Sequence, residues 1–435
     1  MPSEENNVRG YISPGWECVR SVFEQNFNEG LDIGASLCVY HRGKCVVDLS
    51  GGWKDAKTKK EPYTDDTLQL TFSTAKGIMA AAVALCVERG WLDYDAPVTK
   101  YWPQFGQNGK ENILLSDLLS HRSGLPYIDQ QLTVEDVCNW SRMISLLIAE
   151  KPHWDPGSTH GYHGHTIGFL VGELIRCVDP QHRSYGQFVR EELDDQCYIG
   201  VSDDIIEARV APLIRKQANN KNSDVVNSLD PLSEKTLTCS GAFPLGPYQN
   251  SSGIIYNEAQ IHQAELPAVN AITNARSVAR IYARLMGDIY ENGKNIERLL
   301  SEKTLSQAIE NITPVGETDR IVPTIKTAFG KGGFQVYGEI FNVFGDKVFG
   351  HNENNILGGQ KIFIGLFLSI CSSDKCIYLQ LLTGFGGSCA LAYPPDQLSY
   401  AHVCNQLDTS GFSIDQRSIR LLKAIQYVLN HQKEF

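Results

Sequence analysis

The sequence has no apolar run long enough to cross a bilayer as a helix, no Gly-x-Ser-x-Gly and no Cys-x-x-Cys. Its longest nearly uninterrupted apolar run, 362–370, falls far short of the roughly 20 residues that a spanning helix needs. Without Gly-x-Ser-x-Gly the chain lacks the nucleophile elbow of the α/β-hydrolases, so that class is excluded. Internal repeats and low-complexity tracts are also missing, so no repeat architecture is predicted.

Positive charge is scarce as well. The chain carries 39 Lys and Arg against 50 Asp and Glu, which gives a net charge of −11. This balance argues against nucleic acid as a partner and gives no reason to expect binding to a membrane surface. Positions 1–7 are acidic and polar, and they resemble neither a signal peptide nor an Arg-rich transit peptide.

The twelve cysteines are scattered singly along the chain. Most stand in apolar context, as Cys86 and Cys177 do, which is typical of buried, reduced thiols. We therefore expect a reducing compartment and a cytoplasmic protein.

Enough apolar material is present for a sizeable core, because 42% of the 435 residues are hydrophobic and 20% are charged. Strand-like segments gather at both ends of the chain. The pattern over 35–50 predicts a β-hairpin, and further short strands are predicted after Ile321. Helical periodicity dominates the region between them.

We predict an α+β fold in which one antiparallel sheet is built from both chain ends and carries a mostly helical inserted region. Terminal helices over 17–27 and 414–431 flank this sheet. The prediction is a single domain over 10–430, with a sheet part at about 10–72 and 270–430 and a helical part at about 73–269.

A Ser-x-x-Lys at 73–76 joins a strand-like stretch, 67–72, to a strongly apolar helical pattern. Residues three apart share one helix face, so the Lys76 amine can reach the Ser73 hydroxyl. A serine needs a base to become a nucleophile, and a partly desolvated lysine can serve as one. However, roughly two Ser-x-x-Lys are expected by accident in a chain of this length. A second one occurs at 372–375 in a polar, turn-like stretch, so spacing alone leaves both interpretations open.

Further motifs follow in a consistent order. They are Gly-Gly-Trp at 51–53, Leu-Leu-Ser-His-Arg-Ser-Gly-Leu-Pro at 118–126, Pro-Gly at 156–157, Tyr-His at 162–163, Gly-x-x-x-Gly-Glu-Leu-Ile at 168–175, and Glu-Leu-Pro-Ala-x-Asn-Ala-Ile-x-Asn-Ala-Arg-Ser at 265–277. Together with the Ser-x-x-Lys at 73–76, they resemble the serine β-lactamase-related family. Within it, the chain is most similar to the β-lactamase-like esterases, which are related to class C β-lactamases and penicillin-binding proteins. The resemblance runs from about residue 10 to 430 and implies a β-lactamase/transpeptidase-like fold.

The resemblance implies an acyl-enzyme mechanism. Ser73 would attack an ester or amide carbonyl, and Lys76 would help to remove its proton. Tyr162, which matches the family's second motif, would act with Lys76 as general base and then donate to the leaving group. A phenol with an ordinary pKa of about 10 is a poor base at neutral pH, but a neighbouring ammonium lowers that pKa. The expected partner is a small-molecule ester or amide, with no nucleic acid and no membrane, and the sequence predicts no oligomeric state.

Four histidines gather in one stretch and suggest a metal site: His153, His160, His163 and His165. The His-x-His at 163–165 has a spacing that suits zinc. No cysteine or paired carboxylate completes a ligand set, and the mechanism implied by the resemblance uses no metal. We therefore expect neither a metal nor a cofactor.

The third motif of the family is interrupted. The family has a strand with Lys or His, one residue, and then Gly, whose backbone N–H helps to form the oxyanion hole. In this branch we expect Phe-Gly-His-x-Gly-x-Gly-Gly-Ser. The chain gives Phe-Gly-His-Asn at 349–352, then Glu353 where Gly is expected, and Gly-Phe-Gly-Gly-Ser only at 384–388. Joining the two pieces restores the pattern, so residues 353–383 are interpreted as an insert.

Two origins of the insert stay open: a translated non-coding segment, such as a retained intron or a faulty gene model, and a genuine variant loop. We hypothesise that the form without 353–383 is the active hydrolase. In that form His351 stands in the third motif, and the backbone N–H groups of Ser73 and Phe385 make the oxyanion hole. The form with the insert is then impaired, because the insert separates His351 from the glycines of the motif.

A rival hypothesis comes from another functional class. A catalytically impaired homologue could act as a binding or scaffold protein. The interrupted third motif favours this alternative, whereas the intact Ser73, Lys76 and Tyr162 oppose it.

Overall fold

The computed structural model describes residues 6–55, 58–215, 230–244, 247–250, 252–323, 327–336, 344, 348–352, 386–407 and 415–432. Three features of the sequence lie outside these described residues: the suspected insert at 353–383, the second Ser-x-x-Lys within it, and Phe385.

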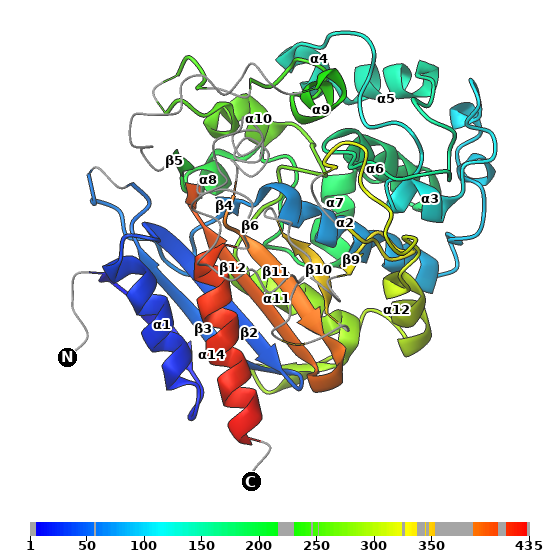
Figure 1. The fold of residues 1–435 in the computed structure, drawn as a ribbon. Coiled ribbons are helices and arrows are strands. Elements are labelled where there is room, and N and C mark those ends of the chain that lie inside the picture. The colour runs from blue at the N-terminus through cyan, green and yellow to red at the C-terminus, as the bar shows by residue number, and fades with distance from the viewer. Residues whose placement is uncertain are drawn as a thin grey trace, which may run out of the picture.

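An antiparallel sheet is built from both ends of the chain, as predicted (Figure 1). Among the described residues it has seven strands in the order β1-β3-β2-β12-β11-β10-β9. The central pair, β2 and β12, joins the N-terminal strands to the C-terminal ones, with Leu37 opposite His402. The strands are β1 (Arg9–Ile12), β2 (Gly34–His41), β3 (Lys44–Gly52), β9 (Gln335–Val336), β10 (Phe349–Asn352), β11 (Cys389–Tyr393) and β12 (Leu398–Cys404).

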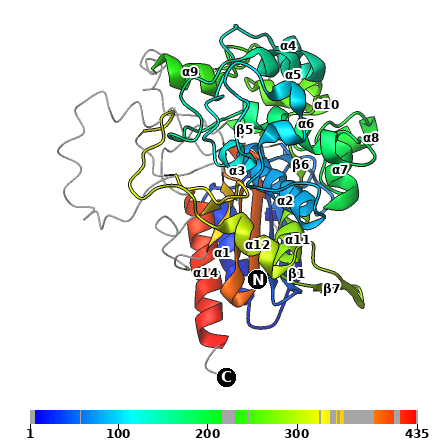
Figure 2. The ribbon, with the colours of Figure 1, turned by 90° about the vertical axis from the view of Figure 1, so that its right-hand side faces the viewer.

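Helices cover both faces of this sheet. Successive side chains on a strand point to opposite faces. On β2, therefore, Leu37 and Val39 pack into one apolar cluster, while Cys38 and Tyr40 pack into another. The terminal helices α1 (Glu17–Asn28) and α14 (Gln416–Gln432) lie side by side on the first face. Helix α11 (Ala275–Met286) lies on the second, as the turned view shows (Figure 2).

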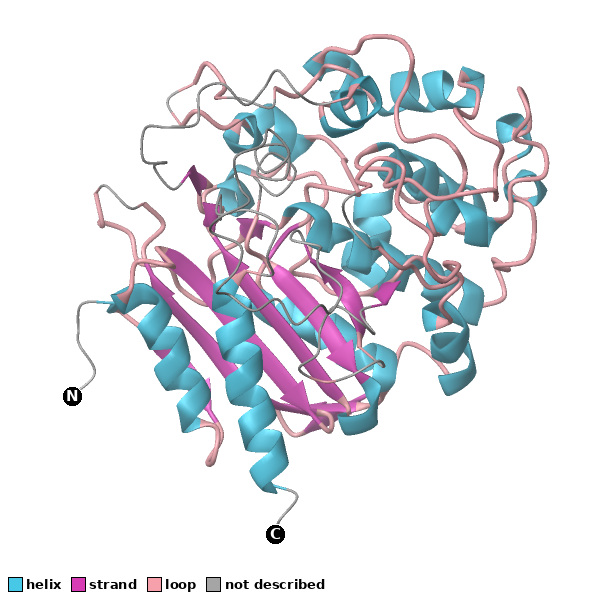
Figure 3. Ribbon diagram, viewed as in Figure 1, coloured by secondary structure: helices cyan, strands magenta, loops and turns pink. Residues whose placement is uncertain are grey.

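The middle of the chain forms a mostly helical region beside the sheet (Figure 3). Its helices are α2 (Ala75–Glu88), α3 (Leu115–Leu119), α4 (Val134–Cys138), α5 (Trp140–Ala149), α6 (Thr166–Val178), α7 (Tyr185–Glu192), α8 (Asp204–Glu207), α9 (Pro231–Leu237) and α10 (Ala259–Gln263), and α12 (Glu302–Ile309) follows α11. Three short strand pairs complete the fold: β4 (Gln69–Leu70) with β6 (Ile272–Thr273), β5 (Ile214–Arg215) with β13 (Gln406–Leu407), and β7 (Ile289–Glu291) with β8 (Lys294–Ile296).

Helix α2 is the central helix of the molecule. Every residue from Ala75 to Cys86 is buried, and alanines dominate its middle. A helix that is apolar all round belongs in a protein interior. It contacts α6, α11, α12 and β10, so it is packed on several sides. None of the helices in the described ranges is both long and apolar enough to cross a membrane.

Candidate active site

The N-terminal end of α2 presents Ser73 on an unusual backbone. Strand β4 is followed by a single 3-10 turn, Phe72–Thr74, which runs directly into α2. Phe72 has a φ of +44°, a left-handed conformation that costs a non-glycine residue about 1–3 kcal/mol. Its buried ring packs edge-on against Tyr256, with 4.9 Å between the ring centroids. The packed ring holds the turn, and Ser73 is half-buried while both its neighbours are buried.

Three of the residues predicted from the sequence meet at this point. The Ser73 Oγ lies 2.7 Å from the Tyr162 hydroxyl oxygen, and the Lys76 ammonium donates to the same Oγ at 3.2 Å. Ser73 and Lys76 stand three residues apart at the start of α2, as the spacing predicted. Tyr162 comes from the loop before α6. The serine hydroxyl is thus shared between a phenol and an ammonium.

Lys76 is held in the interior, with 1% of its surface exposed. Besides Ser73, its Nζ donates to the backbone carbonyls of Gly164 at 2.8 Å and Ala268 at 3.0 Å. An ammonium has three N–H groups, and these three acceptors match them. The Nζ also lies 4.8 Å from the centre of the Tyr162 ring. The protein therefore fixes this amine between the serine and the phenol.

The His351 ring is stacked with the Tyr162 ring. The two rings are nearly parallel, at 14°, with 6.5 Å between their centroids. His351 is 1% exposed, and neither of its ring nitrogens has a hydrogen-bond partner within the described part of the chain. Burial, together with the Lys76 charge, holds its pKa well below the usual 6.5. His351 therefore offers a neutral imidazole with both nitrogens free of described partners.

A glycine on α2, next to Lys76, is packed closely by Tyr282 of α11 and lies beside His351 of β10. A Cβ on Gly77 would lie 1.8 Å from the Tyr282 hydroxyl and 3.4 Å from the His351 Cβ. No side chain larger than hydrogen fits there without moving Tyr282. Gly77, directly after Lys76, thus leaves the space that the Tyr282 hydroxyl of α11 fills, beside the strand that carries His351.

The first piece of the third motif forms β10, and the described end of the second piece leads into the neighbouring strand β11. In the β10–β11 register, His351 is opposite Ala390 and Asn352 is opposite Cys389. The second piece continues into β11 through Ser388, whose backbone carbonyl accepts a hydrogen bond from the Thr74 hydroxyl at 3.3 Å. The residue next to Ser73 therefore touches the Gly-Gly-Ser segment. Phe385, the predicted second donor of the oxyanion hole, is not among the described residues.

The histidines near Tyr162 are engaged in separate hydrogen bonds. His163 Nε2 accepts from the Leu125 backbone N–H at 2.9 Å, and its Nδ1 donates to the Gly161 carbonyl at 2.6 Å. Burial lowers the pKa of His163 to about 3 and that of His165 to about 4, so both are neutral. His165 lies within hydrogen-bonding distance of the Thr236 carbonyl and the Tyr256 hydroxyl. These partners give both rings a structural role.

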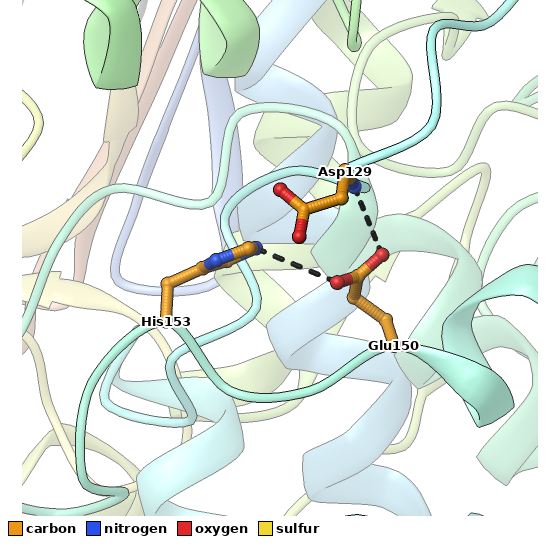
Figure 4. Close-up of side chains that lie close together, drawn as sticks. All are labelled: Asp129, Glu150 and His153. Carbon is orange, nitrogen blue, oxygen red and sulfur yellow. Dashed lines mark hydrogen bonds and ion pairs between the residues drawn. The ribbon is translucent and has the colours of Figure 1, made fainter.

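A different group of side chains has the composition of a metal site (Figure 4). Asp129, Glu150 and His153 offer ligand atoms that all lie within 4.8 Å of one another. Each already has a partner. Glu150 accepts the Asp129 backbone N–H at 2.9 Å, the Lys235 ammonium lies 3.4 Å from Asp129, and His153 Nε2 lies 3.3 Å from the Tyr127 carbonyl. The local sequence gave no signal for this cluster, because its carboxylates come from separate segments.

The chain is similar to known proteins over most of its length. The family model described as Beta-lactamase matches residues 23–351. The esterase/beta-lactamase LipL of Mycobacterium tuberculosis (strain ATCC 25618 / H37Rv) is 30% identical over 315 residues, which cover 71% of each chain. Among solved structures, a family VIII carboxylesterase aligns with a TM-score of 0.77 and 27% identity over 97% of this chain and 100% of its own. A penicillin-binding protein homologue from Caulobacter crescentus aligns with a TM-score of 0.76 and 28% identity over the same shares. These likenesses confirm the predicted fold, and the chain belongs to the β-lactamase family.

Proposed function

We propose that the chain is a serine hydrolase that forms an acyl-enzyme on Ser73 and hydrolyses small esters, with amides and β-lactams as less favoured substrates. The observation that carries this proposal is the contact of one half-buried serine hydroxyl with both a phenol and a buried ammonium. The names of the relatives, an esterase/beta-lactamase and a family VIII carboxylesterase, support the ester preference.

In the acylation step, the Ser73 Oγ forms a bond to the substrate carbonyl carbon while its proton passes to Tyr162. Tyr162 and Lys76 share protons as a coupled pair, and the buried ammonium stabilises negative charge on the phenol oxygen. Tyr162 then gives its proton to the leaving alcohol or amine as the bond from the carbonyl carbon breaks. A water molecule attacks the acyl-serine in the second half, and the same groups return the proton to Ser73.

The opposite side of the site stabilises the carbonyl oxygen in this proposal. The backbone N–H groups of Ser73 and Phe385 form the oxyanion hole, where two fixed donors stabilise the charge that develops in the transition state. His351 remains neutral across the physiological pH range. It therefore acts as a hydrogen-bonding partner of the substrate or of Tyr162 and contributes no positive charge.

A second candidate function follows from the interrupted third motif. The match to the family model ends at residue 351, where the motif breaks. Asn352 pairs with Cys389, so a form without 353–383 would join β10 to β11 through residues 384–388. A hairpin loop of that length is ordinary in proteins. On this basis the shorter form is the full hydrolase, and the form with the insert is an impaired homologue that acts as a binding or scaffold protein.

The test compares both forms with a chromogenic ester and with a fluorophosphonate probe. The probe should label the active form, and Ser73→Ala should abolish both labelling and turnover. Ser145→Ala is the matched control, because this serine lies on α5 in both forms and bonds only the Ser141 carbonyl in the described structure, and labelling should persist. Loss of labelling in that control would refute the assignment of the nucleophile. Equal turnover by the two forms would refute the idea that the insert impairs the enzyme.

A further inference from the structure

The backbone around Tyr162 needs external support. Residues 159–163 belong to no helix or strand, yet they carry a phenol that meets Ser73 at 2.7 Å. In a segment without regular structure, tertiary contacts must fix the position of such a side chain. The hydrogen bonds of this segment therefore show what sets the distance between the phenol and the serine.

Four consecutive backbone N–H groups of this segment are bound by side chains and backbone from two distant parts of the chain. The His160 N–H donates to Glu317 Oε1 at 2.8 Å, the Gly161 N–H to the His121 carbonyl at 3.1 Å, the Tyr162 N–H to Asp319 Oδ1 at 3.1 Å, and the His163 N–H to His121 Nδ1 at 3.0 Å. The segment is thus hydrogen-bonded both to His121 and to residues 317–319. Asp319 is the group that holds Tyr162 itself.

The Asp319 carboxylate is buried and bound on both oxygens. It is 0% exposed, and its Oδ1 also accepts the backbone N–H groups of Ile321 at 2.8 Å and Val322 at 3.1 Å. Its Oδ2 accepts from the Thr327 hydroxyl at 3.1 Å. A buried acceptor bound this many times cannot move without leaving several polar groups unsatisfied. The carboxylate is therefore a fixed hydrogen-bond acceptor for the Tyr162 backbone N–H.

We propose that Asp319 is a positioning residue for the reaction: its buried carboxylate fixes the backbone of Tyr162 and so holds the phenol against Ser73. The inference rests on the proposed function, in which Tyr162 transfers the serine proton. Asp319 makes its recorded bond to the backbone of Tyr162, so it acts through that residue and takes no part in proton transfer. Misplacing a reacting group by about 1 Å costs on the order of 100-fold in rate, and this sets the expected effect.

The experiment is a double-mutant cycle between Tyr162→Phe and Asp319→Ala, measured as kcat/KM on a chromogenic ester with the form that turns over fastest. We expect Tyr162→Phe to lower kcat/KM by about 10²–10⁴-fold, the usual contribution of a general acid–base group. Asp319→Ala should lower it by roughly 10²-fold. If Asp319 acts through the phenol, the double variant should be no slower than Tyr162→Phe alone.

Two further variants separate positioning from general damage to the fold. Asp319→Asn keeps an oxygen acceptor for the Tyr162 N–H and should retain kcat/KM within about tenfold of the original. Asp179→Ala removes another buried carboxylate, which binds Arg183 and contacts none of the residues around Tyr162 in the described structure. It should lower the thermal midpoint and leave kcat unchanged. Should Asp319→Ala fail to fold, Asp319→Ser replaces it in the cycle, because its shorter side chain can still accept the Ile321 N–H but cannot reach Tyr162.

The outcomes distinguish this inference from the proposed function. Losses that multiply in the double variant, or an Asp319→Asn as slow as Asp319→Ala, would overturn the positioning role while leaving the chemistry of Tyr162 intact. A Tyr162→Phe with unchanged kcat/KM would overturn the proposed role of the phenol and the positioning role together. A non-additive cycle with rescue by Asn supports the proposal.

Discussion

Replacing Lys76 with Met should separate the stability of this protein from its activity. Met keeps most of the length of the lysine stem and removes the ammonium, so the buried space stays filled. The change leaves the carbonyls of Gly164 and Ala268 without this donor. Each orphaned carbonyl costs about 1–3 kcal/mol. This loss is offset because the variant no longer buries an ammonium, whose removal from water costs several kcal/mol. We expect the free energy of unfolding to change by no more than about 3 kcal/mol.

The rate should fall much further. Without the ammonium, the Ser73 hydroxyl loses one of its two recorded partners, and Tyr162 loses the positive charge 4.8 Å from its ring. Loss of a general acid–base group usually costs about 10²–10⁴-fold in rate, or about 2.7–5.4 kcal/mol in the barrier. The assay is the single-turnover rate of acylation with a chromogenic ester, paired with the thermal unfolding midpoint of each variant.

Lys110 supplies the matched control. It is also buried, and its Nζ donates to the backbone carbonyls of Ile148 and Glu150, but it contacts none of the groups around Ser73 in the described structure. Lys110→Met should lower stability by a comparable amount and leave the acylation rate unchanged. A Lys76→Met variant that acylates within tenfold of the original, or a Lys110→Met variant that loses as much rate, would refute the reasoning.

Further predictions concern stability and reactivity. His163 and His165 have folded-state pKa values of about 3 and 4, below the ordinary 6.5. The unfolded chain binds protons at these histidines at a higher pH than the folded chain does. The free energy of unfolding should therefore fall from pH 6.5 downward, by up to about 1.4 kcal/mol per pH unit for each. Urea titrations at several pH values should show that this free energy depends less steeply on pH in His165→Gln. Burial raises the pKa of Cys86 to about 12, so iodoacetamide at pH 8 should alkylate it only after unfolding, as peptide mass mapping would reveal. Asn139→Ala should remove the cap of α5 and lower stability by about 1 kcal/mol, while Asn139→Asp should restore it.

The sequence predicted those parts of the fold that have strong local patterns. Helix α6, Thr166–Val178, lies in the middle region where helical periodicity was predicted. In the same region the helical pattern is divided into α4 and α5 at Asn139, whose side chain caps α5 by accepting the Arg142 N–H. The strand expected over 67–72 is only Gln69–Leu70, because the chain leaves the extended conformation for the strained turn at Phe72. Edge strand β1 was missed, since its largely exposed residues show no apolar alternation.

In the candidate site, too, the sequence indicated only the residues that stand in a recognisable local pattern. Ser73 and Lys76 are neighbours on one helix end, so their spacing could indicate chemistry, and Tyr162 followed from its place in a family motif. Asp319 gave no such signal. Its bond to Tyr162 joins residues 157 positions apart, and an aspartate in a polar stretch looks like any surface aspartate until the fold buries it. Contacts of this kind exist only in three dimensions, so local pattern cannot reveal them.

The pairing of β2 with β12 affects how the protein folds while it is being synthesised. Leu37 leaves the ribosome long before its strand partner His402 is made. Contacts between such distant parts of a chain slow folding, because the entropy of closing a very long loop is lost before the strands can pair. A nascent chain therefore carries an incomplete sheet with an apolar strand uncovered, and such edges aggregate readily. We therefore expect the sheet beside Ser73 to close only after β12 has been synthesised.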